Sequence, residues 1–313
     1  MKSALYSLVF FLLLSLLSCQ TIHFSKNSEA LVPKINAVHG RIPFALVLGS
    51  GGSRGLAHIG VLEALEDAGL RPDLIIGCSA GAIVGALYAA NPDTKWLKKI
   101  FLDQKAADFF DFDFDDMFFS LSTNIHLRTF LNKNLPVANF EDLQIPFIAI
   151  ATNLQTGTLT PFFTGPITPT LLASSAVPGV FKPVELYGTY FVDGAVADPV
   201  PVQVARDLNA DFIVAVDIGQ QLPPYPPSNF LDIMWRSLSI NYLAMSRQNV
   251  KQADVSIEVP LANVGTFSDS LNQEFYLLGR ISGQEKIKQI KKILNANLRK
   301  QNRASQFKLK SKL

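Results

Sequence analysis

The sequence predicts an α/β fold built on a mainly parallel sheet. Short apolar runs that fit buried strands, at residues 42–48, 74–76, 145–152 and 212–218, are separated by segments of helical periodicity. Strands that alternate with helices in this way are typical of parallel sheets with helices on both faces. The chain has 313 residues, of which 48% are hydrophobic and 17% charged, so it is long and apolar enough to bury a substantial core.

The N-terminus carries a predicted targeting signal. Lys2 precedes an apolar and serine-containing run, residues 4–18, which ends at Cys19. A positive start followed by an apolar stretch this short predicts a secretory signal, because it is too short to span a membrane. Its end, Leu-Leu-Ser-Cys19, resembles the lipobox of bacterial lipoproteins, which implies cleavage after residue 18 and lipidation of Cys19. The alternative is an ordinary signal peptide with an incidental cysteine.

The first predicted strand leads into a glycine-rich turn, residues 49–55, and then into a helix, residues 56–69. Backbone N–H groups at such a turn can hold an anion. The sixth position counted from Gly49 is Arg54, and no Gly-Lys-Ser/Thr follows, so dinucleotide and P-loop fingerprints are both excluded. The remaining functional interpretation is an oxyanion hole, and the alternative is a glycine turn without chemistry. The candidate oxyanion residues are Gly51, Gly52, Ser53, Arg54 and Gly55.

The next stretch has the form of a nucleophile elbow. An apolar strand runs into Gly77-Cys78-Ser79-Ala80-Gly81, and a small-residue apolar helix follows. Glycines on either side permit the sharp turn that pushes the serine hydroxyl out at the top of a sheet. The pattern alone is common, but its place between a strand and a helix makes Ser79 a candidate nucleophile.

The rest of the chain continues the alternation. A short apolar strand, residues 190–193, delivers Asp193 into a turn at Gly194. Further helices are expected at residues 94–103, 123–132 and 202–208, before residue 251 and from residue 281 onward, and further strands at 158–163 and 254–259. Between them, Phe109–Phe119 interleaves acids with phenylalanines, which favours side chains packed into the core over a cap on an acyl pocket.

The chain contains few groups that could activate a serine. Its four histidines are His23, His39, His58 and His126, and none follows Asp193, so a Ser–Asp–His order cannot be built. This scarcity points to a Ser79–Asp193 dyad, in which burial raises the pKa of the carboxylate so that it can act as the base. Besides Cys19, Cys78 is the only cysteine, which excludes a disulfide framework and a cysteine-based metal site.

Together, the glycine turn, the elbow and the Asp193-Gly194 pair resemble the patatin-like phospholipase family, over about residues 44–218. The resemblance implies a three-layer sandwich and a serine acyl hydrolase that cleaves fatty-acyl esters of lipids or phospholipids without metal or cofactor. By position, Ser79 is the nucleophile, Asp193 the base, and the amides around residues 51–53 the oxyanion donors. The motif glycines are Gly77, Gly81 and Gly194. One departure is Ser50, which stands where the family's turn has its first glycine.

The expected organisation is a signal peptide (1–18), a tether (19–41), a patatin-like hydrolase domain (42–285) and a basic C-terminal helix or tail (286–313). The tail holds ten Lys and Arg and no acid, whereas the whole chain has a net charge of +2. Such a tail either lies on anionic lipid or is a solvated end. We expect a lipid-anchored protein of the bacterial cell envelope, at the outer membrane if the host has two, with a lipid substrate and no nucleic-acid partner. The alternatives are a general carboxylesterase or thioesterase, and a catalytically silent envelope lipoprotein that acts as a binding module.

Overall fold

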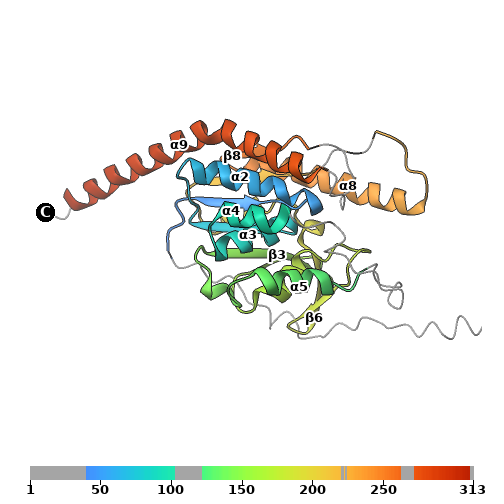
Figure 1. The fold of residues 1–313 in the computed structure, drawn as a ribbon. Coiled ribbons are helices and arrows are strands. Elements are labelled where there is room, and N and C mark those ends of the chain that lie inside the picture. The colour runs from blue at the N-terminus through green and yellow to red at the C-terminus, as the bar shows by residue number, and fades with distance from the viewer. Residues whose placement is uncertain (1–39, 103–121, 220–221, 223, 262–270, 311–313) are drawn as a thin grey trace, which may run out of the picture.

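The computed structural model describes residues 40–102, 122–219, 222, 224–261 and 271–310. Within these ranges, helices cover both faces of one central sheet, so the α/β fold class is confirmed (Figure 1). The signal peptide, Cys19, nearly all of the tether and the segment Phe109–Phe119 lie outside the described residues.

Eight strands form the sheet in the described part of the chain. They are β1 (Ala45–Leu48), β2 (Leu74–Cys78), β3 (Phe147–Asn153), β4 (Leu159–Phe162), β5 (Val184–Leu186), β6 (Thr189–Asp193), β7 (Ile213–Asp217) and β8 (Val255–Glu258). Their order is β5-β6-β3-β2-β1-β7-β8, and β4 also pairs with β3. The five strands β3, β2, β1, β7 and β8 are parallel, while β4, β5 and β6 add antiparallel pairs at one side. The parallel centre follows the predicted alternation, and the three-residue β5 was not predicted because it is too short to show a pattern.

Most helices of the described residues occupy the predicted segments with small shifts in their ends, but α6 was not predicted and α9 begins nine residues before the predicted residue 281. The α-helices are α2 (Leu56–Asp67), α3 (Ala80–Ala90), α4 (Thr94–Leu102), α5 (Ile125–Asn134), α6 (Ile167–Ser174), α7 (Val202–Asp207), α8 (Phe230–Asn249) and α9 (Asn272–Lys310). Short 3₁₀ turns are η2 (Gly52–Gly55), η4 (Phe140–Asp142), η5 (Gly194–Val196) and η6 (Val250–Gln252). Among the described residues, none of these helices combines the length and the apolar character that a bilayer crossing requires.

The two faces of the sheet build two separate cores. In β1, Leu46 and Leu48 pack into a large cluster with α2, α3, α4, α5, α6 and α9, while Ala45 and Val47 pack into a smaller cluster with α7 and η6. This division follows from the strand period of two, which turns successive side chains to opposite faces. Every residue of β1 is therefore buried, which explains why the strand is a continuous apolar run.

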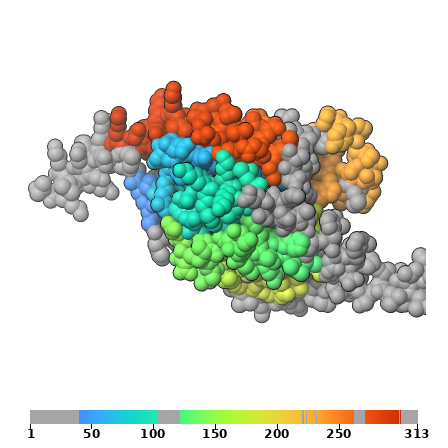
Figure 2. All heavy atoms as spheres, in the orientation of Figure 1, coloured from blue at the N-terminus to red at the C-terminus, as the bar shows by residue number. Residues whose placement is uncertain are grey.

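Helix α9 belongs to the body of the domain. It lies along α2 (Figures 1 and 2), and its last turns extend beyond the sheet (Figure 1). Glycines permit the close contact: a Cβ added at Gly60 would lie 2.1 Å from the carbonyl oxygen of Tyr276, and one at Gly279 would lie 2.0 Å from that of Ala57. The helix runs without interruption through residue 286, the predicted start of the basic C-terminal helix or tail.

Candidate active site

The sheet register explains how distant segments meet at one place. Strand β2 pairs with β3 in parallel, with Cys78 beside Ile150, so Ser79 follows directly at the end of β2. On β3 the next residue, Ala151, pairs with Asp193 at the end of β6. The glycine turn follows β1, the parallel neighbour of β2, and the ends of parallel strands meet at one edge. The register therefore gathers all three predicted motifs.

Ser79 has the backbone of a strained elbow. Its φ of 54° and ψ of −119° are unusual for a residue with a side chain, and such strain persists only where the surroundings hold it. The N–H of Ser79 donates to the hydroxyl of Ser174 at 3.1 Å, and that hydroxyl donates to the carbonyl of Ile150 at 2.6 Å. Ser174 is fully buried, so this short chain of hydrogen bonds ties the elbow to the sheet.

The motif glycines are required by close backbone contacts. A Cβ at Gly77 would lie 2.5 Å from the carbonyl oxygen of Gly81, and one at Gly81 would lie 2.2 Å from that of Leu48. At Gly194 an added Cβ would meet the carbonyl oxygen of Ile150 at 2.4 Å. Any side chain at these three positions would push the elbow or the Asp193 turn away from the sheet.

The side chains of Ser79 and Asp193 are directly bonded. The Ser79 hydroxyl donates to Oδ2 of Asp193 at 2.6 Å, and the exposed fractions of the two residues are 4% and 3%. The N–H of Ala195 donates to Oδ1 at 2.9 Å, which orients the carboxylate. Burial raises the pKa of Asp193 to about 6, and the hydrogen bonds from Ser79 and Ala195 only partly offset this effect. A carboxylate with this pKa is ionised at neutral pH and is a stronger base than an exposed one.

The turn around Asp193 is held by Thr152 of β3. The Thr152 hydroxyl lies 2.9 Å from the carbonyl of Asp193 and accepts a hydrogen bond from the N–H of Ala197 at 3.2 Å. The N–H of Asp193 donates to the carbonyl of Ala176 at 2.9 Å. These contacts fix the backbone that carries the carboxylate.

The glycine turn packs against the start of α3. A Cβ at Gly55 would lie 3.3 Å from the Cβ of Ala80, the residue after Ser79. Gly52 has a φ of +61°, and a Cβ at Gly51 would lie 2.5 Å from the Ile218 side chain, so both positions favour glycine. The N–H groups of Gly51 and Gly52 donate no hydrogen bond to a backbone carbonyl of the described residues. They are therefore available as donors.

Arg54 and Ser53 complete the predicted turn. Arg54 is buried, its Nε donates to the carbonyl of Ile218 at 3.1 Å, and burial lowers the pKa of its guanidinium. Ser53 lies in the 3₁₀ turn η2 beside it. The guanidinium thus holds the turn against the end of β7, and its charge favours a negative oxygen nearby.

The other candidate groups do not join the pair. His58 is fully buried, its Nε2 lies 2.7 Å from the carbonyl of Gly49, and burial lowers its pKa to about 4, so it is a neutral packing residue at pH 7. His126 is exposed in the first turn of α5, whereas the Ser79 hydroxyl donates to Asp193. Burial raises the pKa of the Cys78 thiol well above its usual value, so this group is an unreactive packing residue. Within the described ranges, no group of three or more His, Cys, Asp or Glu residues is arranged to hold a metal ion.

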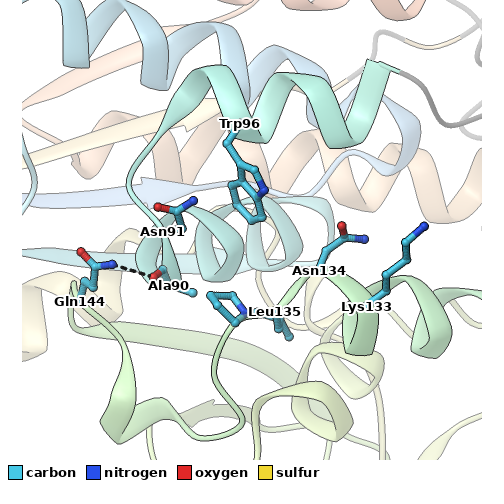
Figure 3. Close-up of a pocket in the computed structure, with 8 residues that line it drawn as sticks. Ala90, Asn91, Trp96, Lys133, Asn134, Leu135 and Gln144 are labelled. Carbon is cyan, nitrogen blue, oxygen red and sulfur yellow. Dashed lines mark hydrogen bonds between the residues drawn. The ribbon is translucent and has the colours of Figure 1, made fainter.

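A surface pocket of about 360 Å³ lies at the other end of α3 (Figure 3). Its lining includes Ala90, Trp96 and Leu135, with Asn91, Lys133, Asn134, Pro136 and Gln144 around them. Ala90 ends the helix that Ser79 begins, and eleven residues of helix span about 16 Å. The pocket is therefore separate from the serine and aspartate.

Three supporting residues were not identified from the sequence. Ser174 and Thr152 hold Ser79 and Asp193, and the hydroxyl of Tyr242 donates to the carbonyl of Ser50 in the glycine turn at 2.7 Å. No local pattern marks such residues, because each contacts a partner between 41 and 192 residues away.

Comparison with known proteins finds a family model and several relatives that are similar to this chain. The family model described as "Patatin-like phospholipase" matches residues 46–206. An uncharacterized NTE family protein of Mycobacterium tuberculosis is 35% identical over 209 residues, which cover 62% of this chain and 56% of the relative. Lysophospholipase NTE1 of Cryptococcus neoformans is 35% identical over 178 residues, 56% of this chain and 11% of its own length.

A solved structure shares the fold. VipD from Legionella pneumophila superposes with a TM-score of 0.53 at 14% identity, covering 82% of this chain and 67% of that one. The chain spans about half the length of the mycobacterial relative and a small part of the fungal one. The residues that the family model matches, 46–206, contain all three motifs described above.

Proposed function

Because this chain belongs to the patatin-like phospholipase family, we propose that it is a serine acyl hydrolase that cleaves fatty-acyl esters of lipids. Ser79 is the nucleophile and Asp193 is its base. The relative named as a lysophospholipase supports a phospholipid or lysophospholipid substrate. A general carboxylesterase would use the same groups and would differ in its preference for chain length.

The reaction proceeds in two halves. Ser79 Oγ attacks the acyl carbonyl carbon while its proton passes to Asp193 Oδ2, and the carbonyl oxygen becomes an oxyanion. The amides of Gly51 and Gly52 donate to that oxyanion. The C–O bond to the alcohol breaks and the alcohol leaves with the proton from Asp193. Water then attacks the acyl-enzyme with Asp193 again as base, which releases fatty acid and restores Ser79.

The observation that carries this proposal is the 2.6 Å hydrogen bond from the Ser79 hydroxyl to a buried carboxylate. Ser79 lies on a strained turn and is bonded to a carboxylate whose pKa is raised to about 6. This carboxylate is a base strong enough to take the serine proton at neutral pH. A binding module would have no need of this pairing.

We also propose that the protein is a lipoprotein of the bacterial envelope, anchored through Cys19. Three features support this proposal: the positively charged Lys2 near the N-terminus, the apolar run of residues 4–18, and the Leu-Leu-Ser-Cys19 sequence at the end of that run. The ten Lys and Arg residues of the segment 286–313 provide a second attraction, an electrostatic one, to anionic lipid. Mass spectrometry of the mature N-terminus tests this: a diacylglyceryl group on Cys19 supports it, and an unmodified chain cut elsewhere contradicts it.

The test of activity compares the wild-type protein with Ser79→Ala and Asp193→Asn. Release of fatty acid from phospholipid vesicles, from lysophospholipid micelles and from short-chain p-nitrophenyl esters is measured. We expect both variants to lose about 10⁴-fold or more in kcat with the fold retained. Ser175→Ala is the matched control, because the Ser175 hydroxyl donates to the carbonyl of Leu171, one turn earlier in the chain, and not to Ser79 or Asp193 among the described residues. Activity that survives Ser79→Ala would overturn the mechanism, and a strong preference for the short esters would favour a general esterase.

A further inference from the structure

Three successive carbonyl groups of the glycine turn each accept a hydrogen bond. The carbonyl of Gly49 lies 2.7 Å from Nε2 of His58, and the carbonyl of Ser50 accepts from the Tyr242 hydroxyl at 2.7 Å. The carbonyl of Gly51 accepts from the N–H of Arg54 at 3.4 Å. Each peptide unit between residues 49 and 52 is therefore held through its oxygen.

Holding a carbonyl also sets the direction of the next N–H. A trans peptide is planar, so the C=O of Ser50 and the N–H of Gly51 point in opposite directions from one rigid unit. The hydrogen bond from Tyr242 thus fixes where the Gly51 N–H points. Without it, the Ser50–Gly51 peptide could rotate more easily, because glycine has a broad range of allowed backbone angles.

Tyr242 is itself firmly placed by α8. On the same face of this helix, at spacings of four and three residues, Ser246 donates to Asp217 at the end of β7, and Asn249 donates to Asp198 at 2.8 Å. The Tyr242 ring lies against Gly219, where an added Cβ would be 2.9 Å from Cε1 of the ring. Burial raises the pKa of the Tyr242 hydroxyl, so this group remains a protonated donor.

We infer that Tyr242 is a positioning residue that orients the Gly51 amide as an oxyanion donor. The inference rests on the proposed function, since it assigns a role within that reaction. Tyr242 does not touch substrate; it acts through the Ser50 carbonyl. The competing explanation is that its hydroxyl only anchors α8, as the hydroxyl of Ser246 does.

The two explanations make different kinetic predictions for Tyr242→Phe, which removes the hydroxyl and keeps the ring. An oriented amide acts only on the negative oxygen of the transition state, so its loss lowers kcat and leaves KM nearly unchanged. We expect kcat on a p-nitrophenyl ester to fall by about tenfold to a hundredfold, less than the loss of a whole oxyanion donor. The rate at which a fluorophosphonate labels Ser79 should fall in step, because its phosphoryl oxygen occupies the same hole.

Two variants of the full chain serve as controls. Ser246→Ala removes a hydrogen bond from the same helix face without touching the turn, and Tyr225→Phe removes a hydroxyl from a side chain that is 66% exposed. Both should keep kcat within about twofold of wild type. Thermal melting of all three variants shows whether Tyr242→Phe destabilises the fold more than Ser246→Ala does.

The outcomes separate the inference from the proposed function. A Tyr242→Phe variant with wild-type kcat, or a Ser246→Ala variant that loses as much kcat, overturns the positioning role while leaving the Ser79–Asp193 mechanism in place. A wild-type protein without ester hydrolysis overturns the proposed function, and this inference with it.

Discussion

The hydroxyl of Ser79 lies 2.6 Å from Oδ2 of Asp193, although 114 residues separate them in the chain. Both residues are almost completely buried, and the carboxylate also accepts a hydrogen bond from the N–H of Ala195. Burial is the reason that the pKa of Asp193 rises to about 6, because the hydrogen bonds from Ser79 and Ala195 offset it only in part. This property leads to measurable consequences for both activity and stability.

The pH dependence of kcat/KM should report the ionisation of Asp193. Only the ionised carboxylate can accept the Ser79 proton, so kcat/KM should rise with pH to a plateau, with a midpoint at about 6. Below that midpoint the rate should fall about tenfold per pH unit. The profile is measured with a neutral p-nitrophenyl ester, so that the substrate itself does not titrate. His126→Asn should leave the midpoint unchanged, and a midpoint that moves in this variant would assign the base to histidine.

Asp193→Asn should stabilise the fold at high pH. The pKa of Asp193 in the folded protein is above its ordinary value of 3.8, so the folded state binds protons more tightly than the unfolded chain. At low pH the protonated Asp193 carboxyl contributes to the free energy of unfolding, and this contribution is lost as the pH rises from about 4 through about 6. Asparagine avoids this loss, and urea unfolding at pH 8 should show the variant to be more stable by up to about 3 kcal/mol.

The advantage of Asp193→Asn should shrink at pH 4.5, where the wild-type carboxyl is largely protonated. Asp142→Asn, a change at an exposed carboxylate, is measured at both pH values as the matched control. An equal difference between wild type and Asp193→Asn at the two pH values would contradict a raised pKa.

Ser174→Ala should impair the elbow without removing a reacting group. The change leaves the N–H of Ser79 and the carbonyl of Ile150 without their side-chain partner, which costs about 1–3 kcal/mol of unfolding free energy. We expect kcat to fall by about tenfold or more, because the strained backbone of Ser79 loses one of its supports. Ser175 is the next residue and is also buried, and Ser175→Ala should retain the wild-type kcat. Equal activity of the two variants would show that the Ser174 hydroxyl is not needed to hold the elbow.

Gly279→Ala should destabilise the domain, although alanine is the better helix former. Helix propensity alone predicts a gain of about 1 kcal/mol in an exposed helix. At Gly279, however, the new Cβ would lie 2.0 Å from the carbonyl oxygen of Ala57, so α2 and α9 must separate. We expect a net loss of about 2–4 kcal/mol in chemical unfolding. As a control, Gln284→Ala on the exposed side of α9 should change the free energy of unfolding by less than about 0.5 kcal/mol. A Gly279→Ala variant more stable than wild type would mean that α2 and α9 do not pack closely.

Much of the fold could be predicted because the relevant signals are local. The apolar run of β1 and the helical spacing of α2 follow from residues that are close in the chain. The elbow could be predicted for the same reason, since the glycines on either side of Ser79 are part of one short stretch. By contrast, the length of α9 was underestimated at its start, because the packing of Phe275 and Gly279 against α2 extends the helix to Asn272.

The supporting contacts could not be predicted in this way. Ser174 meets Ser79 across 95 residues, and Tyr242 meets Ser50 across 192 residues. The residues next to Ser174 and Tyr242 in the sequence do not distinguish them from the other serines and tyrosines of the chain. Only the sheet register and the packing of α8 decide which of them reaches the site.

The α/β alternation and the groups available for chemistry follow from the amino-acid sequence. These groups are a serine on an elbow, an aspartate before a glycine and a glycine-rich turn, with few histidines. Backbone preferences and side-chain chemistry are local properties, which is why they can be read from short stretches. The tertiary structure alone decided that Ser79 and Asp193 meet, that burial raises the carboxylate pKa, and that Tyr242 holds the Ser50 peptide. Distance, desolvation and orientation arise only when remote segments pack together and exclude water.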